Sequence, residues 1–379
     1  MSAVAERRST GTTPGAAVPP SQSSPPSVPP VPLEHEDLVV RRGTRSGRYV
    51  IIAVHSTALG PALGGVRLWH YPSTVDGIRD ALRLARGMTL KAAAAGLALG
   101  GGKGVVCGPD PAPTGRERRD LLLDFGDLVD SLGGRYTTAE DVGISPPDLV
   151  AIRERTAHVT GLPADHGGSG DPSPSTALGV EAAMRACSRA RFGSPELSGR
   201  RIVVAGMGHV GAKLARRLVE HGADVSVSDI DPAKRAVARE LGAAWLKPPE
   251  ELIAECDILA PCALGGAIDA ANLPLLRCEI VCGCANNQLA DDQLANDLDE
   301  RGILYAPDFV VNAGGLIHVY KEIRGYSEEH ARDLALGIEA NLDDILATSA
   351  EDSVTPLEAA RAIALERLAN ARLERTAVA

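Results

Sequence analysis

The stretch RRIVVAGMGHVGAKLARRLVEHGADVSVSD, residues 200–229, decides the fold of the second half of the chain. An apolar strand runs into Gly206-x-Gly208-x-x-Gly211, a helix follows, and a second strand ends at Asp229. A strand before the glycines, a helix after them and an acidic residue about 20 positions on together form the fingerprint of a dinucleotide-binding βαβ unit. The stretch therefore predicts a Rossmann domain.

The residues of this fingerprint have distinct expected roles. Gly206 permits the tight turn, Gly208 lets the backbone reach the pyrophosphate, and Gly211 lets the helix pack closely on the strand. A carboxylate at Asp229 holds the ribose hydroxyls and repels a 2′-phosphate, so we expect NAD rather than NADP. The loop that faces the cofactor is completed by Met207, His209 and Val210.

Further strand-and-helix units follow in CDILAPCALGG, EIVCGCANNQLA and GILYAPDFVVNAGGL. Each strand ends in small or amide residues, which are typical of strand ends that line a ligand crevice. Seven cysteines without a C-x-x-C pair favour a reducing compartment, so a cytoplasmic protein is expected. Cys278, Cys282 and Cys284 are interpreted as buried structural thiols, and no metal is expected because no histidine neighbours them.

The first half also alternates strands and helices. RYVIIAVHST predicts a strand that GPALGG, residues 60–65, ends in a turn, and STVDGIRDALRLARGMTLKAAAAG predicts an amphipathic helix. GGGKGVVCG predicts a loop entering a strand, and GGRYTTAEDVG a strand that leads to Asp141. The predicted fold class is therefore α/β, with an N-terminal substrate and catalytic domain and a Rossmann NAD-binding domain.

The expected domain limits follow from composition. The Pro-rich residues 1–33 offer little to bury and predict a disordered tail. We place the first domain at 34–165, the Rossmann domain at 166–326, and C-terminal helices that return to the first domain at 327–379. A net charge of -10 argues against nucleic acid and anionic membranes as partners, and no apolar run is long enough to span a bilayer.

The stretch LGGGKGVV, residues 99–106, allows two interpretations. A phosphate-binding P-loop fails on spacing, because Leu97 and Gly104 stand where that motif needs glycine and a hydroxyl residue. Alternatively, the glycines keep the amine of Lys103 free at the floor of a cleft. With Lys91 and Asp141, the chain then supplies a cation for a carboxylate, an amine base and an acid.

Eight stretches in order carry a resemblance to a known family: AVHSTALGPALGG, DALRLARGMTLK, GLALGGGKGVV, GGRYTTAEDVG, GDPSPSTALGV, APCALGG, ANNQLA and GILYAPDFVVNAGG. From about residue 34 to 375 the chain resembles the glutamate, leucine, phenylalanine and valine dehydrogenases, most closely the actinobacterial valine dehydrogenase branch. The resemblance implies reversible NAD-dependent deamination of an L-amino acid to a 2-oxo acid and ammonium by a homo-oligomer.

The resemblance also assigns residue roles. Lys91 would bind the substrate carboxylate, Lys103 would act as base, with a neighbouring Lys91 helping to keep it neutral, and Asp141 would shuttle a proton to nitrogen. The backbone of Gly64 and Gly65 would border the substrate. The side chain would be recognised by Leu63, Val66, Met88, Thr160, Leu316 and Val319. The cofactor would meet Thr176 and Asn287 on its nicotinamide side and Ala260, Pro261, Cys262 and Ala263 on its adenosine side.

Some positions depart from the family pattern, namely Val66, Ala92, Leu316 and Lys321. The larger Leu316 favours a valine-sized substrate over phenylalanine. We interpret His166 and His318 as structural or peripheral, because a lysine already fills the role of base. The expected function is NAD-dependent oxidative deamination of a branched-chain, valine-like L-amino acid. Three alternatives stay open on sequence grounds: this deamination on another amino acid, an imine reduction, and a non-catalytic NAD-binding regulator.

Overall fold

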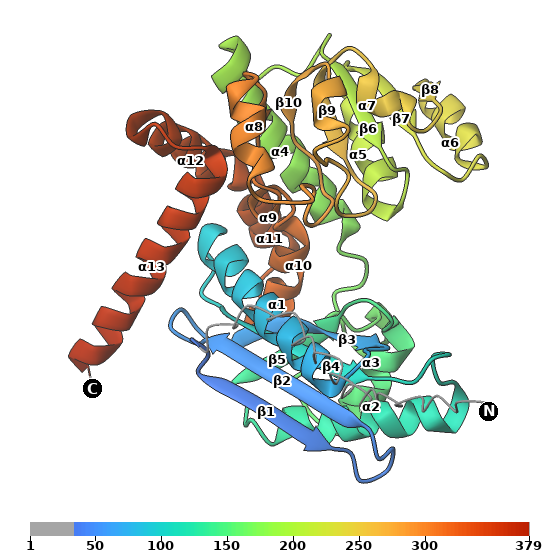
Figure 1. The fold of residues 1–379 in the computed structure, drawn as a ribbon, viewed down its shortest axis with the longest axis vertical. Coiled ribbons are helices and arrows are strands. Elements are labelled where there is room, and N and C mark those ends of the chain that lie inside the picture. The colour runs from blue at the N-terminus through green and yellow to red at the C-terminus, as the bar shows by residue number, and fades with distance from the viewer. Residues whose placement is uncertain (1–33, 379) are drawn as a thin grey trace, which may run out of the picture. The chain divides into compact units, whose positions relative to one another are not determined.

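The computed structural model describes residues 34–378, with side chains through residue 375. The predicted Pro-rich tail over residues 1–33 lies outside the described residues. Two β-sheets, one in each half of the described chain, are followed by a set of C-terminal helices (Figure 1).

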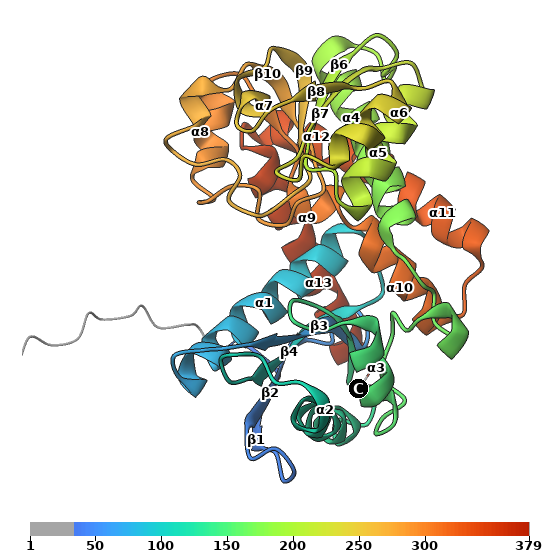
Figure 2. The same ribbon diagram turned by 90° about the vertical axis from the view of Figure 1, so that its right-hand side faces the viewer.

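The first sheet contains β1 (Asp37–Arg42), β2 (Tyr49–Ser56), β3 (Ala62–Trp69), β4 (Gly100–Cys107) and β5 (Tyr136–Glu140). Its order is β1-β2-β4-β3-β5; β2 pairs antiparallel with β1 and β4, and β3 pairs parallel with β4 and β5. Figure 2 shows α1 (Thr74–Ala94) on one side of this sheet and α2 (Gly115–Asp130) on the other. Helix α3 (Pro146–Arg153) packs beside α2.

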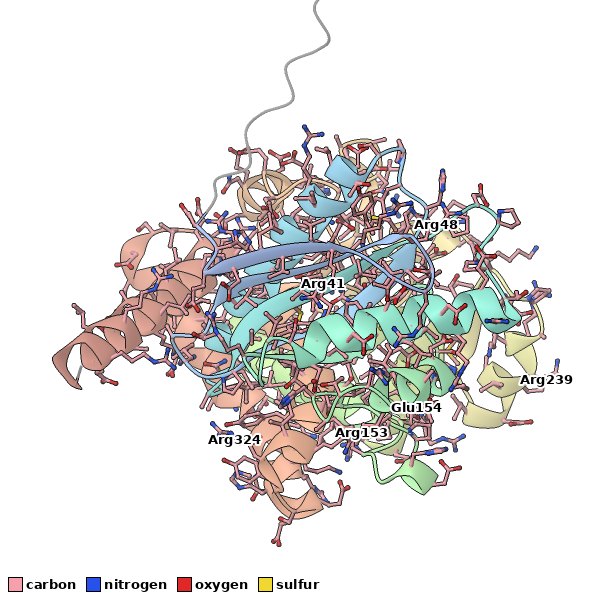
Figure 3. The ribbon with its side chains drawn as sticks, turned by 90° about the horizontal axis from the view of Figure 1, so that it is seen from below. Arg41, Arg48, Arg153, Glu154, Arg239 and Arg324 are labelled. Atoms are coloured by element: carbon pink, nitrogen blue, oxygen red, sulfur yellow. The ribbon has the colours of Figure 1, made fainter. Side chains whose placement is uncertain are left out.

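On the face of the sheet that α2 covers, polar contacts connect α2 to β1 and to α3. Arg41 of β1 donates from Nη2 to Ser131 Oγ at 3.2 Å, at the end of α2. Arg119 of α2 pairs with Glu154 at the end of α3, with 2.6 Å between Nη2 and Oε2. Figure 3 shows Arg41 and Glu154 beside α2 on this face.

The turn predicted at GPALGG is confirmed only for Gly60 and Pro61, and the loop predicted at GGGKGVVCG is wrong, because these glycines lie in β4. The turn after β2 ends before Ala62, and Gly64 and Gly65 belong to β3. In β4, a Cβ on Gly101 would lie 2.1 Å from the backbone N of Thr89 in α1. A Cβ on Gly102 would lie 2.6 Å from a ring carbon of Tyr136. These glycines therefore let the helix and the neighbouring strand approach β4 closely.

The helix predicted from STVDGIRDALRLARGMTLKAAAAG is confirmed as α1. Ser73 caps its N-terminus, where the hydroxyl accepts from Asp76 N at 3.3 Å. Its C-terminus is held by Arg367 of α13 (Pro356–Val378), which donates from Nη1 to Ala93 O at 2.8 Å and to Ala94 O at 3.0 Å. The last helix thus contacts the first, while the domain limits at 165 and 326 stay predictions.

The second sheet is a six-stranded parallel sheet. It contains β6 (Arg201–Ala205), β7 (Asp224–Ser228), β8 (Ala244–Leu246), β9 (Cys256–Pro261), β10 (Cys278–Val281) and β11 (Leu304–Tyr305). The spatial order β11-β10-β9-β6-β7-β8 is the doubly wound order of dinucleotide-binding folds. The predicted Rossmann domain is confirmed.

The remaining helices flank this sheet or follow it. They are α4 (Ser173–Phe192), α5 (His209–Glu220), α6 (Lys234–Leu241), α7 (Glu250–Ile253), α8 (Leu294–Glu300), α9 (Asp308–Val311), α10 (Gly314–Arg324), α11 (Glu328–Leu336) and α12 (Ile338–Asp352). Within residues 34–378, none of the helices has the length and apolar character needed to cross a bilayer.

Candidate active site

Lys103 and Asp141 form the centre of the candidate site. Lys103 projects from β4 on the α1 side of the sheet, since Gly101 two residues earlier faces Thr89 of α1. Its Nζ lies 2.7 Å from Asp141 Oδ2, and the residue is only 5% exposed. Burial lowers the pKa of Lys103, although the charge of Asp141 opposes this effect. The predicted lowering therefore comes mainly from burial, Arg67 is a contributing positive neighbour, and Lys91 and Lys103 also repel each other.

Arg67 is a member of the site that the sequence did not reveal. Its Nε donates to Asp141 Oδ2 at 2.9 Å and its Nη1 to Asp80 Oδ2 at 2.9 Å. Tyr71 donates its hydroxyl to the same Asp80 oxygen at 2.7 Å. Burial alone would raise the pKa of Asp141, but Lys103 and Arg67 hold this pKa below its ordinary value. The carboxylate of Asp141 is thus kept ionised between two cations.

Lys91 lies in the last turn of α1 and meets an amide from the second half of the chain. Its Nζ donates to Asn312 Oδ1 at 2.7 Å. Asn312 Nδ2 in turn donates to Asn286 Oδ1 at 3.0 Å, which fixes the amide with its oxygen toward the lysine. Burial lowers the pKa of Lys91 to about 8, opposed by the buried carboxyl of Asp308 and assisted by the charge of Lys103.

Asn312 and Asp308 were also missed from the sequence. The only signal was the general presence of amide and small residues after the strands in GILYAPDFVVNAGGL. The contact with Lys91 joins residues 221 positions apart, so no local pattern could have indicated it.

The two glycines predicted beside the substrate are required by close backbone contacts. A Cβ on Gly64 would lie 1.7 Å from the carbonyl oxygen of Gly102, directly before Lys103. A Cβ on Gly65 would lie 2.4 Å from Glu140 O and 2.9 Å from the Cβ of Asp141. Any side chain here would therefore displace the strand ends that position the lysine and the carboxylate.

An apolar cluster adjoins this centre. Leu63 is 1% exposed and Leu316 is 6% exposed, and both belong to one buried cluster. Met88 and Val319 pack against the same cluster. Thr160 lies beside Val319, with its hydroxyl 3.4 Å from the carbonyl oxygen of that residue.

Val66 does not join this apolar set. It pairs with Gly104 on the opposite face of the sheet, where the core contains Phe125 and Tyr136. Successive residues of a strand point to opposite faces, so Val66 cannot reach the side on which Lys103 lies. We therefore remove Val66 from the candidate substrate pocket, since it is a core residue beneath α2.

The other departures from the family pattern lie close to the site. Ala92 is fully packed in the cluster beside Lys91, with no polar group to offer. Lys321 of α10 is buried and forms an ion pair with Glu328 of α11.

The two histidines have contacts that fit structural or peripheral roles. His318 hydrogen-bonds through Nε2 to Ser169 O at 2.9 Å and through Nδ1 to Ser175 Oγ at 3.2 Å. His166 is exposed and lines a surface pocket of about 330 Å³ together with Arg153 and Glu322.

The dinucleotide fingerprint has the geometry that its spacing predicts. Gly206 has φ +115°, and a Cβ there would lie 2.8 Å from the backbone N of Ala263. A Cβ on Gly211 would lie 1.9 Å from Gly206 O, so only glycine lets α5 approach β6 this closely. A Cβ on Gly208 would meet no atom of the described chain within 4 Å, which leaves this position open toward a ligand.

The groups around this loop fit NAD. Helix α5 begins at His209, and no described side chain caps its N-terminus, so its first N–H groups face outward as at phosphate sites. Asp229 follows β7 and accepts from Met207 N at 2.7 Å and from Asp231 N at 2.8 Å. Its carboxylate is thus fixed beside the glycine loop, where a ribose diol would lie.

The remaining predicted cofactor residues lie around the ends of β9, β10 and α4. Ala260 and Pro261 are buried within β9, Cys262 N donates to Ala205 O at 2.8 Å, and Ala263 is exposed beside the glycine loop. Thr176 lies on α4, and Asn287 has φ +52° in the loop after β10. Their contacts with a cofactor stay predictions.

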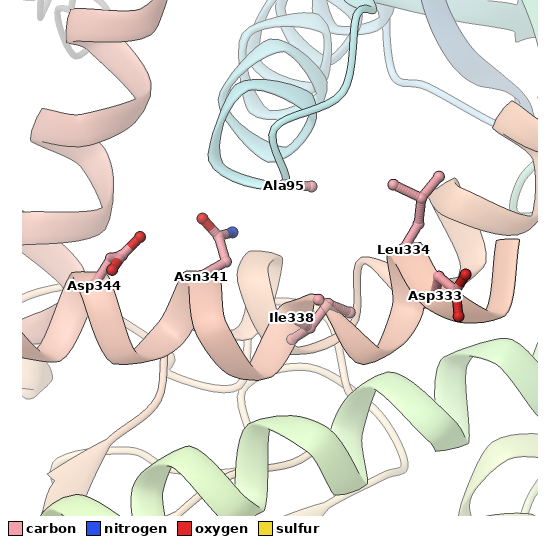
Figure 4. Close-up of a pocket in the computed structure, with 7 residues that line it drawn as sticks. Ala95, Asp333, Leu334, Ile338, Asn341 and Asp344 are labelled. Carbon is pink, nitrogen blue, oxygen red and sulfur yellow. The ribbon is translucent and has the colours of Figure 1, made fainter. Parts of the chain in front are cut away.

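The other surface pocket described for the chain also lies away from the catalytic groups. It has a volume of about 280 Å³ and is formed where α11 and α12 meet the end of α1 (Figure 4). The residues that line it are Ala95, Asp333, Leu334, Gly337, Ile338, Asn341 and Asp344. Neither pocket includes Lys91, Lys103 or Asp141, so the candidate site is separate from both of them.

A Rossmann domain together with the buried Lys103, the partly buried Lys91 and an ionised carboxylate indicates a dinucleotide-dependent dehydrogenase. Comparison with known proteins gives the particular family. Residues 38–158 match the dimerisation domain of the Glu/Leu/Phe/Val dehydrogenases, and residues 232–376 match the second Glutamate/Leucine/Phenylalanine/Valine dehydrogenase domain. Residues 179–264 match the NAD-binding domain of D-isomer specific 2-hydroxyacid dehydrogenases.

Whole-chain relatives agree with these matches. The chain is 44% identical to leucine dehydrogenase from Bacillus subtilis, over 90% of this chain and 94% of the relative. It is 44% identical to valine dehydrogenase from Streptomyces virginiae, over 89% and 95%. The structure of L-tryptophan dehydrogenase from Nostoc punctiforme matches with TM-score 0.81 and 41% identity, over 89% and 97%. The chain belongs to the Glu/Leu/Phe/Val dehydrogenase family, and it is an NAD-dependent dehydrogenase of hydrophobic amino acids.

Proposed function

We propose that this enzyme oxidises a small branched-chain L-amino acid such as valine to its 2-oxo acid, with release of ammonium, and catalyses the reverse reaction. The observation that carries the proposal is the apolar cluster beside the lysines. It contains Leu63 and Leu316 and is bordered by Met88 and Val319, so no charged group of this set is available to a polar substrate side chain.

The contacts of the polar residues support the roles that the family resemblance implies. Lys91, with its amine held by Asn312, binds the substrate carboxylate. The glycine loop and Asp229 would hold NAD, which would supply the acceptor for the hydride of the α-carbon. Lys103, whose pKa is lowered by burial, takes a proton from the water that attacks the resulting imino carbon. Asp141 passes a proton to the departing nitrogen and is positioned for this by Lys103 and Arg67.

Substrate size and charge separate the members of the family. A glutamate side chain would bring an unpaired carboxylate into the apolar cluster, at a cost of several kcal/mol. One methylene among aliphatic substrates changes transition-state binding by only about 1–3 kcal/mol. We therefore expect firm rejection of glutamate and graded preference among aliphatic substrates, with valine above leucine and phenylalanine.

The test is NADH formation with a panel of L-amino acids that includes valine, isoleucine, leucine, phenylalanine, tryptophan and glutamate. Leu316→Ala should narrow the gap in kcat/KM between valine and phenylalanine, because it enlarges the pocket. Leu365→Ala, on the half-exposed face of α13, is the matched control and should leave the ranking unchanged. A wild-type preference for phenylalanine, tryptophan or glutamate would show that the pocket is misassigned.

The preference for NAD over NADP rests on Asp229. Its carboxylate is fixed by the backbone N–H groups of Met207 and Asp231 and has negative charge to repel a 2′-phosphate. Asp229→Ser should weaken NAD binding and reduce the discrimination against NADP. Equal use of both cofactors by the unmodified enzyme would contradict this assignment.

Two further features support a cytoplasmic homo-oligomer. The seven cysteines are unpaired thiols, as expected in a reducing compartment. Strand β1 lies at the edge of the first sheet and exposes Leu38 and Val40, which suits an interface between copies of the chain. Light scattering after gel filtration measures the subunit number. Leu38→Lys with Val40→Lys should lower it if β1 forms the contact.

A further inference from the structure

Cys262 and Cys284 lie side by side where β9 and β10 end. The register of the two parallel strands pairs Leu259 with Val281. Past the strands the alignment shifts by one residue, because Ala285 N, and not the N–H of residue 284, donates to Pro261 O at 2.9 Å. This bond places residue 284 opposite residue 261, next to Cys262, and the thiols of Cys262 and Cys284 hydrogen-bond to each other.

This arrangement suits a disulfide bond. Neighbouring strands lie about 4.7–4.9 Å apart. The Cα atoms of a disulfide are usually about 4.4–6.8 Å apart. Residues on neighbouring strands whose thiols already hydrogen-bond, as those of Cys262 and Cys284 do, are therefore near the separation that a disulfide needs.

Two properties favour selective oxidation of a cysteine: a second thiol close by and partial exposure to solvent. Other cysteines of the chain have one of these properties but not both. Cys256 and Cys278 are register partners on the same two strands, but both are buried and burial raises the pKa of each to about 12. Cys107 is partly exposed, but no other thiol interacts with it.

Cys262 and Cys284 are both close together and partly exposed. In addition, the hydrogen bond from the Cys284 thiol lowers the pKa of Cys262, which favours the reactive thiolate. Both conditions for selective oxidation thus occur together at this pair.

The pair also lies between the two functional parts of the site. A Cβ on Gly211 of the dinucleotide loop would lie 3.2 Å from the Cβ of Cys262. The carbonyl oxygen of Cys284 accepts from Asn312 Nδ2 at 3.2 Å, and Asn312 holds the amine of Lys91. A covalent bond between these sulfurs would therefore displace both the dinucleotide loop and the amide that holds Lys91.

We propose that Cys262 and Cys284 form an oxidisable dithiol site that closes to a disulfide under a two-electron oxidant such as an azodicarboxamide or a peroxide. With the azo compound, both S–H bonds break and one S–S bond forms, while two electrons and two protons pass to the N=N bond to give a hydrazine. Closure draws the sulfurs from contact to about 2.05 Å and shifts residues 262 and 284. Resting on the proposed function, this shift weakens NADH and substrate binding and lowers turnover reversibly.

The experiment treats the full-length enzyme with diamide and measures three quantities. Thiol titration after denaturation should fall from seven free thiols to five. Peptide mapping without reduction should identify a peptide that links Cys262 to Cys284. Activity should fall in step with the linked fraction and return with dithiothreitol, and NADH should slow the loss if the pair adjoins the bound cofactor.

Matched variants locate the effect. Cys284→Ser should keep activity before oxidation and resist diamide, whereas Cys107→Ser should lose activity as the wild type does. A link between other cysteines, a link between two chains, or no link in the folded enzyme would overturn the proposal. Because the linked peptide is measured without turnover, its formation tests the dithiol site even if the substrate assignment fails.

Discussion

The amine of Lys103 lies 2.7 Å from the carboxylate of Asp141; Lys103 belongs to β4, and Asp141 directly follows β5 of the same sheet. Burial of the amine favours its neutral form, whereas the carboxylate favours its charged form. The balance suits a group that exchanges a proton with water during each turnover.

Replacing Lys103 should therefore abolish proton exchange without disturbing the cofactor. We expect Lys103→Ala to lower kcat by a factor of at least about 10², since a general base contributes roughly 10²–10⁴. The dissociation constant for NADH, measured by fluorescence, should stay near the wild-type value. Lys247→Ala, at an exposed position in the second half, is the control. Near-normal turnover in Lys103→Ala would make this lysine a structural residue.

Arg67 should tune the pKa of Asp141. It donates to the same oxygen as Lys103 and helps to hold this pKa below its ordinary value. Removing the guanidinium in Arg67→Ala should raise the pKa of Asp141, so the acid limb of the kcat/KM profile should move to higher pH. Arg83→Ala is a matched control, because Arg83 pairs with Asp80 but does not contact Asp141. An unchanged acid limb in Arg67→Ala would argue against this role.

Lys91 should control the alkaline limb of substrate binding. Burial lowers its pKa to about 8, and only the protonated amine can hold a carboxylate. Equilibrium binding of the 2-oxo acid to the enzyme with NADH, without ammonium, should weaken above about pH 8, by about tenfold per pH unit. Lys91→Arg should remove this limb, because a guanidinium stays charged. An unchanged binding constant between pH 7 and 10 in the wild type would contradict the assignment.

The lowered pKa of Lys91 also makes the folding stability depend on pH. Above about pH 8 the folded chain has released a proton that the unfolded chain still holds up to the ordinary lysine pKa of 10.5. The unfolded state then binds more protons, so the contribution of Lys91 to folding stability rises with pH across this window. Lys91→Met, which removes the titrating group, should flatten the corresponding part of a plot of Tm against pH.

How far the sequence could predict the molecule depended on whether the signal was local. The fingerprint with Gly206, Gly208 and Gly211 predicted its structure correctly, because the turn, the close packing and the open position all depend on neighbours within one βαβ unit. The glycines of GGGKG were misassigned to a loop, since glycine is also used inside a strand where a second layer approaches closely. That approach involves Thr89 and Tyr136, which no local pattern connects to β4.

Arg67 and Asn312 were not predicted as site residues, for a related reason. Their ion pair or hydrogen bond with the predicted residues spans 74 and 221 positions of the chain, respectively. Val66 was included in the pocket from its position in a motif, but strand alternation directs it to the other face of the sheet. Residue type and spacing thus predicted which groups the chemistry needs, and the sheet decides which of them meet.

Arg367 should position Lys91 from the last helix. Its guanidinium donates to the carbonyl oxygens of Ala93 and Ala94 at the end of α1, one turn from Lys91. Arg367→Ala should lower Tm, because charge-assisted hydrogen bonds contribute about 1.5–3 kcal/mol each, and it should raise KM for the amino acid more than it lowers kcat. Arg367→Lys should restore part of both effects. Arg361→Ala on the same helix, which loses only a pair with Asp292, should leave KM unchanged.

The glycines of the dinucleotide loop give a paired prediction that separates folding from binding. A Cβ on Gly211 would lie 1.9 Å from Gly206 O, so Gly211→Ala must push α5 away from β6 and should lower Tm strongly. A Cβ on Gly208 meets no described atom within 4 Å, and φ of -72° suits alanine. Gly208→Ala should therefore keep the wild-type Tm while NADH binding is lost, because the methyl group occupies the space in which the pyrophosphate approaches the backbone. Thermal unfolding with and without NADH measures both effects: the cofactor should raise the Tm of the wild type and have little effect on Gly208→Ala. A normal NADH-induced rise in the Tm of Gly208→Ala would place the pyrophosphate elsewhere.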